Sequence, residues 1–241
     1  MRFLASVLWF CAVSLAQSIS APNVGSPLSD ADEVQIGKSL AEQFMQTAGI
    51  QSTPQTTKIE GYLQTVGGRL AVHAQRKLPY RFHFDPNPAF KSAFALPGGE
   101  IFVGGGILAL MDTEDQLAAV LGHEMEHIAQ NQCRDRLIKE LGAAHLSVET
   151  AAPLKVAPFL RDYGHDGELT ADREGVKLSA EAGYSPEGAI RLLTTFLILE
   201  KQGVRPSREA EQDIQDRIEQ IQRLIQDDKL AMPTEKALAL P

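Results

Sequence analysis

Apolar residues recur every three or four positions along most of this chain, a spacing that predicts amphipathic helices. The first such stretch begins at Ser29 or Asp30, either of which can cap a helix. Further helices are predicted over the ranges 56–73, 113–138, 166–182, 185 onward and 208–230. The last of them places four isoleucines on one face, which indicates packing against the rest of the protein: Ile214, Ile218, Ile221 and Ile225.

A different pattern interrupts the helices between residues 80 and 103. Residues 80–84 alternate in the manner of a strand, and the segments 93–96 and 100–103 flank the turn residues Pro97, Gly98 and Gly99. This pattern predicts a small antiparallel sheet. The chain is therefore expected to adopt an α+β fold that is mainly helical.

The helix predicted at 113–138 opens with Thr113 and Gln116, which form a capping-box pattern. Residues 143–160 follow it with a less regular pattern, broken by Pro153 and Pro158. A loop, a lid and a short packing helix are all compatible with that stretch. The end of the chain, about residues 226–241, is expected to fray into a disordered tail.

The first twenty residues read as a secretory signal peptide, with Arg2 followed by an apolar run over residues 3–15. That run is shorter than the roughly 20 residues of a spanning helix, which argues against an uncleaved anchor. Cleavage after Ala16 and cleavage after Ser20 both remain open. The remaining residues, 21–241, are expected to form a single domain, exported to the periplasm or cell envelope and soluble after cleavage.

Composition narrows the class of protein further. The 241 residues are 44% hydrophobic and 22% charged, which is typical of an ordinary globular domain. The net charge of -8 comes without a basic stripe, so nucleic acid is not an expected partner. Of the two cysteines, Cys11 lies in the signal peptide, so the mature chain keeps Cys133 alone and can form no internal disulfide.

Residues 123–127 read HEMEH, which places His123 and His127 one turn apart on the same face of the predicted helix. Two imidazoles at this spacing can bind one zinc ion from a rigid support. Glu124 is turned about 100° away, where its carboxylate can act as the general base on water. Glu126 is expected to be solvated surface.

A catalytic zinc needs a third protein ligand. Glu168 is the candidate: it begins the segment ELTAD, and Asp172 lies one turn further on the same face, where it can orient a histidine. Spacing alone leaves another interpretation open, because acidic residues also favour the start of a helix for electrostatic reasons.

Three segments together resemble the HtpX-like gluzincin peptidases, a family that includes the CAAX prenyl proteases and small periplasmic metallopeptidases. The segments are AFALPGGEIFVG at 93–104, AAVLGHEMEHI at 118–128, and ELTADREG with AGYSPEGA between 168 and 189. This resemblance implies a zincin-type domain with one zinc ion per chain, Glu168 as its third ligand and Asp172 as a supporting aspartate.

The same resemblance implies how a substrate would bind. Residues Ala93, Phe94 and Ala95 would form an edge strand that offers unpaired backbone groups to an extended or unfolded polypeptide. Partners in envelope or outer-membrane assembly are possible by the same likeness. Ser92 stands where the family often has an asparagine that contacts the substrate.

The resemblance departs from the family near the last helix. Arg205 and Pro206 stand where the family commonly has a His-Pro pair, and Arg217 lies further along than the usual arginine. The sequence therefore supports no histidine gating or transition-state role at that place. His165, one turn before Glu168, is a candidate for stabilising the transition state or for a fourth ligand, and a surface histidine is the alternative.

Three hypotheses on function follow. The leading one is a zinc metalloendopeptidase that hydrolyses unfolded or misassembled envelope proteins. The alternative is a metal-stabilised, chaperone-like binding protein without proteolysis. The third is a helical scaffold without a metal. Another first-row metal in place of zinc also stays open, because histidine and carboxylate ligands accept several.

Overall fold

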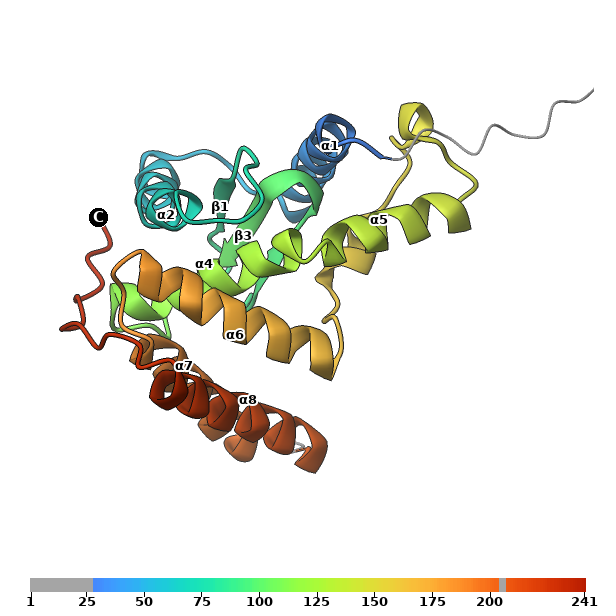
Figure 1. The fold of residues 1–241 in the computed structure, drawn as a ribbon. Helices are drawn as coiled ribbons and strands as arrows, with labels where there is room; N and C mark the ends of the chain where they lie inside the picture. The colour runs from blue at the N-terminus through green and yellow to red at the C-terminus, as the bar shows by residue number, and fades with distance from the viewer. Residues whose placement is uncertain (1–27, 204–206) are drawn as a thin grey trace, which may run out of the picture.

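The computed structural model describes residues 28–203 and 207–241 as a mainly helical protein with one small sheet (Figure 1). The predicted signal peptide, its cleavage positions and the pair Arg205 and Pro206 lie outside the described residues. The helix α4 (Glu114–Ala129) runs through the middle of the fold. On one side of α4 lie the sheet, α1 (Asp30–Ala48) and α2 (Pro54–Ala71). On the other side lie α6 (His165–Glu181), α7 (Glu187–Gln202) and α8 (Arg208–Asp227).

Helix starts follow the capping residues in the sequence. Ser29, Thr53 and Thr113 each form a capping box at the start of α1, α2 and α4, respectively. Each hydroxyl accepts a hydrogen bond from a backbone N–H that would otherwise have no partner within the helix. The predicted starts of the first helix and of the motif-bearing helix are thereby confirmed.

The sheet has three strands in the order β1-β3-β2, with bounds Arg81–Asp85, Glu100–Gly104 and Ala93–Ala95. The strands β2 and β3 pair antiparallel, as the turn residues predicted, but β1 and β3 pair in parallel. The expectation of a purely antiparallel sheet is therefore wrong. In the sheet, β3 lies between β1 and β2. The chain runs through β2 in the direction opposite to β1 and then turns back into β3, so β3 runs in the same direction as β1.

The turn between β2 and β3 depends on two glycines. Gly98 and Gly99 have φ values of 77° and 109°, in the left-handed region that favours glycine. Gly98 also lies against α1, where a Cβ atom would come within 2.4 Å of the Cα atom of Val34. The turn is part of the 3-10 helix η1 (Pro97–Gly99), and the short helix α3 (Gly105–Leu108) follows β3.

The helix predicted over residues 113–138 is two helices. It ends at Ala129, and α5 (Gln132–Ala143) starts after Asn131, which has a φ of 62°. Asparagine tolerates this left-handed conformation better than most residues, and a single such residue redirects a helix. The apolar spacing continues across the break because both helices pack against the core, so periodicity alone did not reveal it.

Residues 143–160 fold into two 3-10 helices, η2 (Val148–Thr150) and η3 (Ala157–Leu160), joined by irregular chain. The side chains of Leu154, Val156 and Phe159 are buried in a cluster with residues of α1, α5 and the sheet. This stretch is therefore packed against the domain, and η3 leads directly into the segment before α6.

The end of the chain differs from the disordered tail expected after residue 226. Helix α8 continues to Asp227, and the following residues return to the start of α4 (Figure 1). The Lys236 carbonyl accepts a hydrogen bond of 2.8 Å from the Glu114 N–H, and the Lys236 N–H donates one of 2.7 Å to the Asp115 carboxylate. These bonds satisfy free groups in the first turn of α4, which gives the tail a defined position.

The first helix is attached through a buried charge. Glu33 is fully buried, and its carboxylate accepts hydrogen bonds from Arg76, from Arg134 of α5 and from the Gly98 N–H. A buried carboxylate needs this degree of pairing, because removing a charge from water costs several kcal/mol. The network therefore ties α1 to α5 and to the turn before β3.

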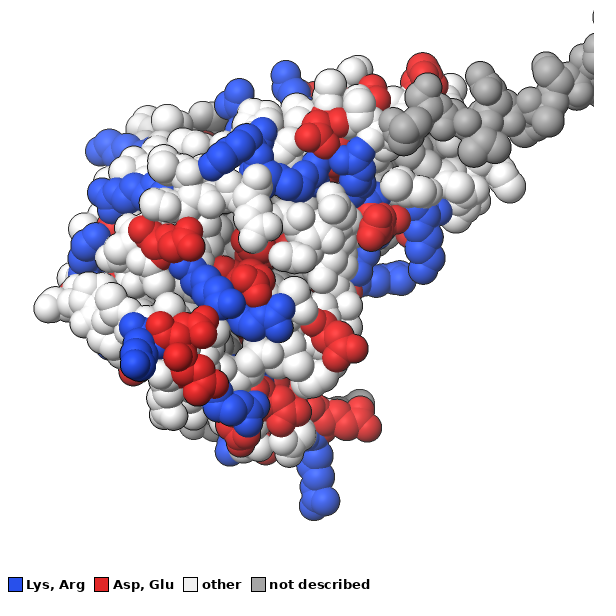
Figure 2. All heavy atoms as spheres, in the orientation of Figure 1, with Lys and Arg blue, Asp and Glu red and all other residues white. Residues whose placement is uncertain are grey.

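Acidic and basic side chains are interspersed on the face of the molecule drawn in Figure 2. Among the described residues, no helix has both the length and the hydropathy that crossing a membrane requires. Cys133 is a free, buried thiol in the core beside α4.

Candidate metal centre

The two histidines of α4 face one another across a single turn. The Nε2 atoms of His123 and His127 lie 3.0 Å apart, and the ring planes are nearly perpendicular at 88°. His127 is buried and His123 is half-buried. The helical spacing of four residues thus brings both ring nitrogens to one point, as the sequence predicted.

The opposite nitrogen of each ring is held by an oxygen. The Nδ1 of His123 lies 2.8 Å from the Asp172 carboxylate, and the Nδ1 of His127 lies 2.5 Å from the side-chain oxygen of Gln132. Each of these nitrogens therefore carries a proton and donates it. In neutral rings this leaves a lone pair on both Nε2 atoms, and two lone pairs 3.0 Å apart repel unless a positive charge lies between them.

Glu168 of α6 reaches the same point from the other side. Its carboxylate oxygens lie 3.2 Å from Nε2 of His123 and 3.7 Å from Nε2 of His127. One ligand atom from each of the three residues lies within 4.8 Å of the others. Ligands at tetrahedral corners about 2.05 Å from zinc are roughly 3.3 Å apart, so these separations fit a zinc ion with little movement.

The electrostatics favour a cation at this point. Burial opposes a charge on His123, but its hydrogen bonds to Asp172 and Glu168 raise its pKa to about 10. Burial also opposes a charge on Glu168, yet the contact with His123 holds its pKa near 2. The site thus binds either a proton or a metal ion, and only a metal ion can satisfy both imidazoles and the carboxylate together.

Helices α4 and α6 pack closely beneath these side chains. A Cβ atom on Gly122 would lie 2.7 Å from the carbonyl oxygen of Gly175, and the Ser179 hydroxyl donates a hydrogen bond to the Ala118 carbonyl. Because neither glycine has a side chain, α6 comes near enough for Glu168, two turns before Gly175, to reach the histidines. The sequence contained these glycines, but not the fact that they face each other.

Asp172 and Arg217 form a pair behind His123. The Arg217 guanidinium donates two hydrogen bonds to the Asp172 carboxylate, at 2.5 and 2.9 Å, and lies 3.6 Å from Glu168. Burial would raise the pKa of Asp172, but the bonds from Arg217 and His123 hold it below its usual range. Arg217 comes from α8 and neutralises two carboxylates at the site.

Sequence reasoning set Arg217 aside because its spacing differs from the family pattern, and it did not single out Gln132. The signal that was available for Arg217 is its position on the face of α8 that carries Ile214 and Ile221 toward α6. For Gln132 there was no signal, because its contact with His127 depends on the break after α4.

Glu124 lies in a cavity of about 230 Å³ beside the two histidines. The cavity is bounded by β2 on one side and by apolar side chains of α7, among them Leu192 and Phe196, on another. Burial raises the pKa of Glu124 to about 7, while the charge of His123 and a hydrogen bond from Ala95 oppose the shift. A carboxylate with a pKa near neutrality can both accept and return a proton.

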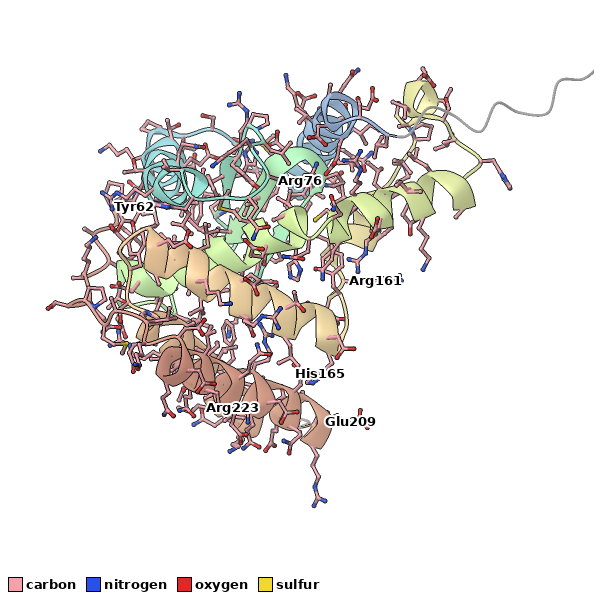
Figure 3. All side chains as sticks on the ribbon, viewed as in Figure 1. Tyr62, Arg76, Arg161, His165, Glu209 and Arg223 are labelled. Carbon is pink, nitrogen blue, oxygen red and sulfur yellow. The ribbon has the colours of Figure 1, made fainter. Side chains whose placement is uncertain are left out.

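Two expectations do not fit the structure. His165 does not reach the metal-binding atoms: its Nδ1 lies 2.6 Å from the Asp213 carboxylate, and the side chain is exposed where the start of α6 faces α8 (Figure 3). His165 is the first residue of α6, and its side chain contacts α8 instead of the histidines of α4. Glu126 is buried rather than solvated, because the far face of α4 is covered by neighbouring elements, and it accepts a hydrogen bond from Gln130.

Comparison with known proteins gives separate evidence on the class of protein to which this chain belongs. A family model described as Peptidase family M48 matches residues 57–225. The Beta-barrel assembly-enhancing protease of Escherichia coli K12 is 26% identical over 205 residues, which cover 76% of this chain and 41% of that protein. The Mitochondrial metalloendopeptidase OMA1 of Schizosaccharomyces pombe is 29% identical over 170 residues, covering 65% of this chain and 50% of that protein. The chain thus spans half or less of the length of these relatives.

Proposed function

Since the chain belongs to peptidase family M48, we propose that it is a zinc-dependent metalloendopeptidase in which His123, His127 and Glu168 bind the ion and Glu124 is the catalytic base. One observation carries this proposal: two imidazoles from α4 and a carboxylate from α6 converge on one point in a cavity that also holds Glu124. Asp172 supports His123 in this arrangement.

Each side chain has a defined part in the hydrolysis of a peptide bond. When bound, zinc acts as a Lewis acid and makes water a nucleophile near neutral pH. The Glu124 carboxylate takes a proton from the attacking water while the oxygen of this water bonds to the peptide carbonyl carbon. Glu124 then gives this proton to the leaving nitrogen as the C–N bond breaks. Asp172 keeps the Nδ1 proton on His123, which leaves Nε2 free to bind the ion.

The substrate class follows from the strand beside the base. Residues Ala93, Phe94 and Ala95 form the edge strand β2 and line the cavity next to Glu124. An extended polypeptide can add to such an edge through backbone hydrogen bonds, whereas a folded protein cannot present its backbone in this way. The substrates we propose are therefore unfolded or extended polypeptides.

We extend this to the cell envelope. The name of the Escherichia coli relative refers to β-barrel assembly, and the sequence before residue 21 is typical of a signal peptide. The proposal is an exported enzyme that degrades misassembled envelope proteins, with outer-membrane assembly components as possible partners.

The experiment is the exchange Glu124→Gln, measured with an unfolded, fluorescently labelled polypeptide and with its folded form. The variant is expected to retain one zinc ion per chain and to lose hydrolysis of the unfolded substrate by at least about 100-fold. Glu126→Gln is the matched control, because it makes the same change on α4 at a carboxylate that does not line the cavity. Undiminished hydrolysis by Glu124→Gln would disprove the assigned role.

The chaperone-like alternative predicts a different result. Under that hypothesis, the unaltered protein suppresses aggregation of the unfolded polypeptide without cleaving it, and Glu124→Gln does so equally well. Detection of cleavage products that depend on zinc and on Glu124 excludes this alternative.

A further inference from the structure

Tyr163 touches two of the three residues that converge on the metal-binding point. Its backbone N–H donates a hydrogen bond of 3.1 Å to Oε1 of Glu168. Its ring packs on the His127 imidazole, with ring centroids 4.5 Å apart and a tilt of 33°. A movement of Tyr163 would therefore change the position of a carboxylate oxygen and of an imidazole together.

Tyr163 is in turn fixed by α5. Its hydroxyl donates a hydrogen bond to the Cys133 sulfur at 3.2 Å. The guanidinium carbon of Arg136 lies 3.7 Å from the centre of the tyrosine ring, within the range of a cation–π contact. Cys133 and Arg136 lie on the same helix as Gln132, which holds the Nδ1 of His127.

Arg136 also fixes the segment that leads into α6. Its guanidinium donates hydrogen bonds to three backbone carbonyls, those of Pro158, Arg161 and Asp162, at 3.2, 2.6 and 2.7 Å. Figure 3 shows Arg161 in this segment, beside α5. Only a planar guanidinium offers several donors in one plane together with a flat face for an aromatic ring, so lysine cannot replace all of these contacts.

The chain between η3 and α6 has little regular structure of its own. The last residue of η3 is Leu160 and α6 begins at His165, so the position of Tyr163 depends on contacts from elsewhere. Space beside it is restricted as well: a Cβ atom on Gly167 would lie 2.9 Å from the Cβ of Tyr163 and 3.2 Å from the Gln132 amide nitrogen.

From these contacts we infer that Arg136 and Tyr163 are positioning residues for the metal centre, which act by holding Glu168 and the His127 ring at the separation that a metal ion needs. This inference rests on the zinc site proposed above. It assigns to α5, which supplies no ligand and no base, the task of setting the affinity of the site for its ion.

The test compares Arg136→Lys with Arg134→Lys. Arg134 is the matched control because it lies on the same helix, but its guanidinium donates to the carboxylates of Asp30 and Glu33 of α1, away from the metal centre. Zinc affinity is measured by competition with a chelator of known affinity, and thermal unfolding is measured on the metal-free proteins. Arg136→Lys is expected to weaken zinc binding about 10- to 100-fold, while Arg134→Lys leaves it unchanged.

A second pair of variants covers the case in which Arg136→Lys does not fold. Tyr163→Phe keeps the aromatic ring, and Tyr163→Leu removes it while the backbone N–H remains. Zinc affinity is expected to stay within about threefold for the phenylalanine variant and to fall at least about tenfold for the leucine variant.

Equal zinc affinity in Arg136→Lys and the unaltered protein would overturn the inference, as would equal losses in Arg136→Lys and Arg134→Lys. Equal affinity in Tyr163→Phe and Tyr163→Leu would overturn it as well. These results differ from failure of the proposed function, which would appear as an absence of zinc binding in the unaltered protein.

Discussion

Gly175 of α6 packs directly against His123 of α4: a Cβ atom on Gly175 would lie 2.7 Å from the His123 backbone nitrogen and 2.9 Å from its Cα atom. The contact lies at the crossing of the two helices that bring the proposed ligands together. The distance from Glu168 to the histidines therefore depends on the absence of a side chain at this position, as it does at Gly122.

The exchange Gly175→Ala is expected to push α6 away from α4. Overpacking of this kind costs about 1–3 kcal/mol in the free energy of unfolding, and zinc binding should weaken because Glu168 moves with α6. Denaturant unfolding and chelator competition measure the two effects.

The matched control is Gly61→Ala in α2, where a Cβ atom would meet nothing within 4 Å. The free energy of unfolding of this variant is expected to rise by up to about 1 kcal/mol, because alanine is a better helix former than glycine. If Gly175→Ala were as stable as the unaltered protein and bound zinc equally well, the close helix crossing would not be required.

Asp172→Asn tests the support behind His123. The amide is nearly the same size, but it lacks the negative charge that accepts the hydrogen bond from the His123 Nδ1–H and pairs with Arg217. Zinc affinity is expected to fall about 10- to 100-fold, as is usual when a ligating histidine loses such a partner.

Asp213→Asn is the control for this prediction, since Asp213 binds His165 outside the cavity. It should leave zinc affinity and hydrolysis unchanged. Equal losses of zinc affinity in Asp172→Asn and Asp213→Asn would indicate that His165 acts at the metal centre, contrary to the geometry.

The start of α4 predicts a pH dependence of stability. Burial alone would raise the pKa of Glu114, but hydrogen bonds from Tyr62 and Tyr184 and the charge of Arg69 hold it below its usual value. A carboxyl with a lowered pKa in the folded state stabilises the protein above its unfolded pKa, near 4.5. This contribution decreases as the pH falls below that value, and it is lost as the pH falls through the lower pKa of the folded state.

Glu114→Gln should therefore destabilise the protein by about 1.5–3 kcal/mol at pH 7, the size expected for hydrogen bonds to a charged group. The difference from the unaltered protein should be smaller at pH 3 than at pH 7, because at pH 3 the carboxyl is protonated in the unfolded chain and ionising it no longer favours the folded state to the same extent. Denaturant unfolding at the two pH values measures this difference in stability. A difference that is the same at both pH values would contradict the lowered pKa of Glu114.

Removal of the metal should lower the thermal midpoint without unfolding the domain. A ligand that binds the folded protein alone stabilises it by about 2.7 kcal/mol at a free concentration 100 times its dissociation constant. The apolar cluster around α4 does not include the ligand side chains, so the metal-free protein should stay folded.

A chelator is therefore expected to lower the midpoint of the unaltered protein, and added zinc should restore it. His127→Ala should not respond to either treatment. The same response in that variant would mean that the stabilising ion binds somewhere else.

The sequence was sufficient for the parts of this site that depend on local spacing. His123 and His127 meet because a helix repeats every 3.6 residues, and Thr113 fixes where that helix begins. The strand β2 was predictable from the turn residues between it and β3. Glu168 and Asp172 required the resemblance to known peptidases, because nothing local connects α6 to α4.

The remaining parts depend on contacts between distant segments or on the break in the helix after Ala129, and no local pattern encodes either. Arg217 lies 45 residues after Asp172 and reaches it because α8 packs along α6. Gln132 reaches His127, and Arg136 reaches Tyr163, because Asn131 interrupts the helix and redirects the chain. The sequence hides this break because the apolar spacing continues across it. The burial of Glu126 has the same origin, since it depends on what covers the far face of α4.

The most direct test of the central claim is zinc X-ray absorption on the protein purified without chelators, together with Glu168→Ala. We predict one zinc per chain with two imidazole nitrogens at about 2.0–2.1 Å and a carboxylate oxygen at about 2.0–2.2 Å, and loss of that protein oxygen in Glu168→Ala. A different number of imidazoles, or a zinc environment that Glu168→Ala leaves unchanged, would contradict the account.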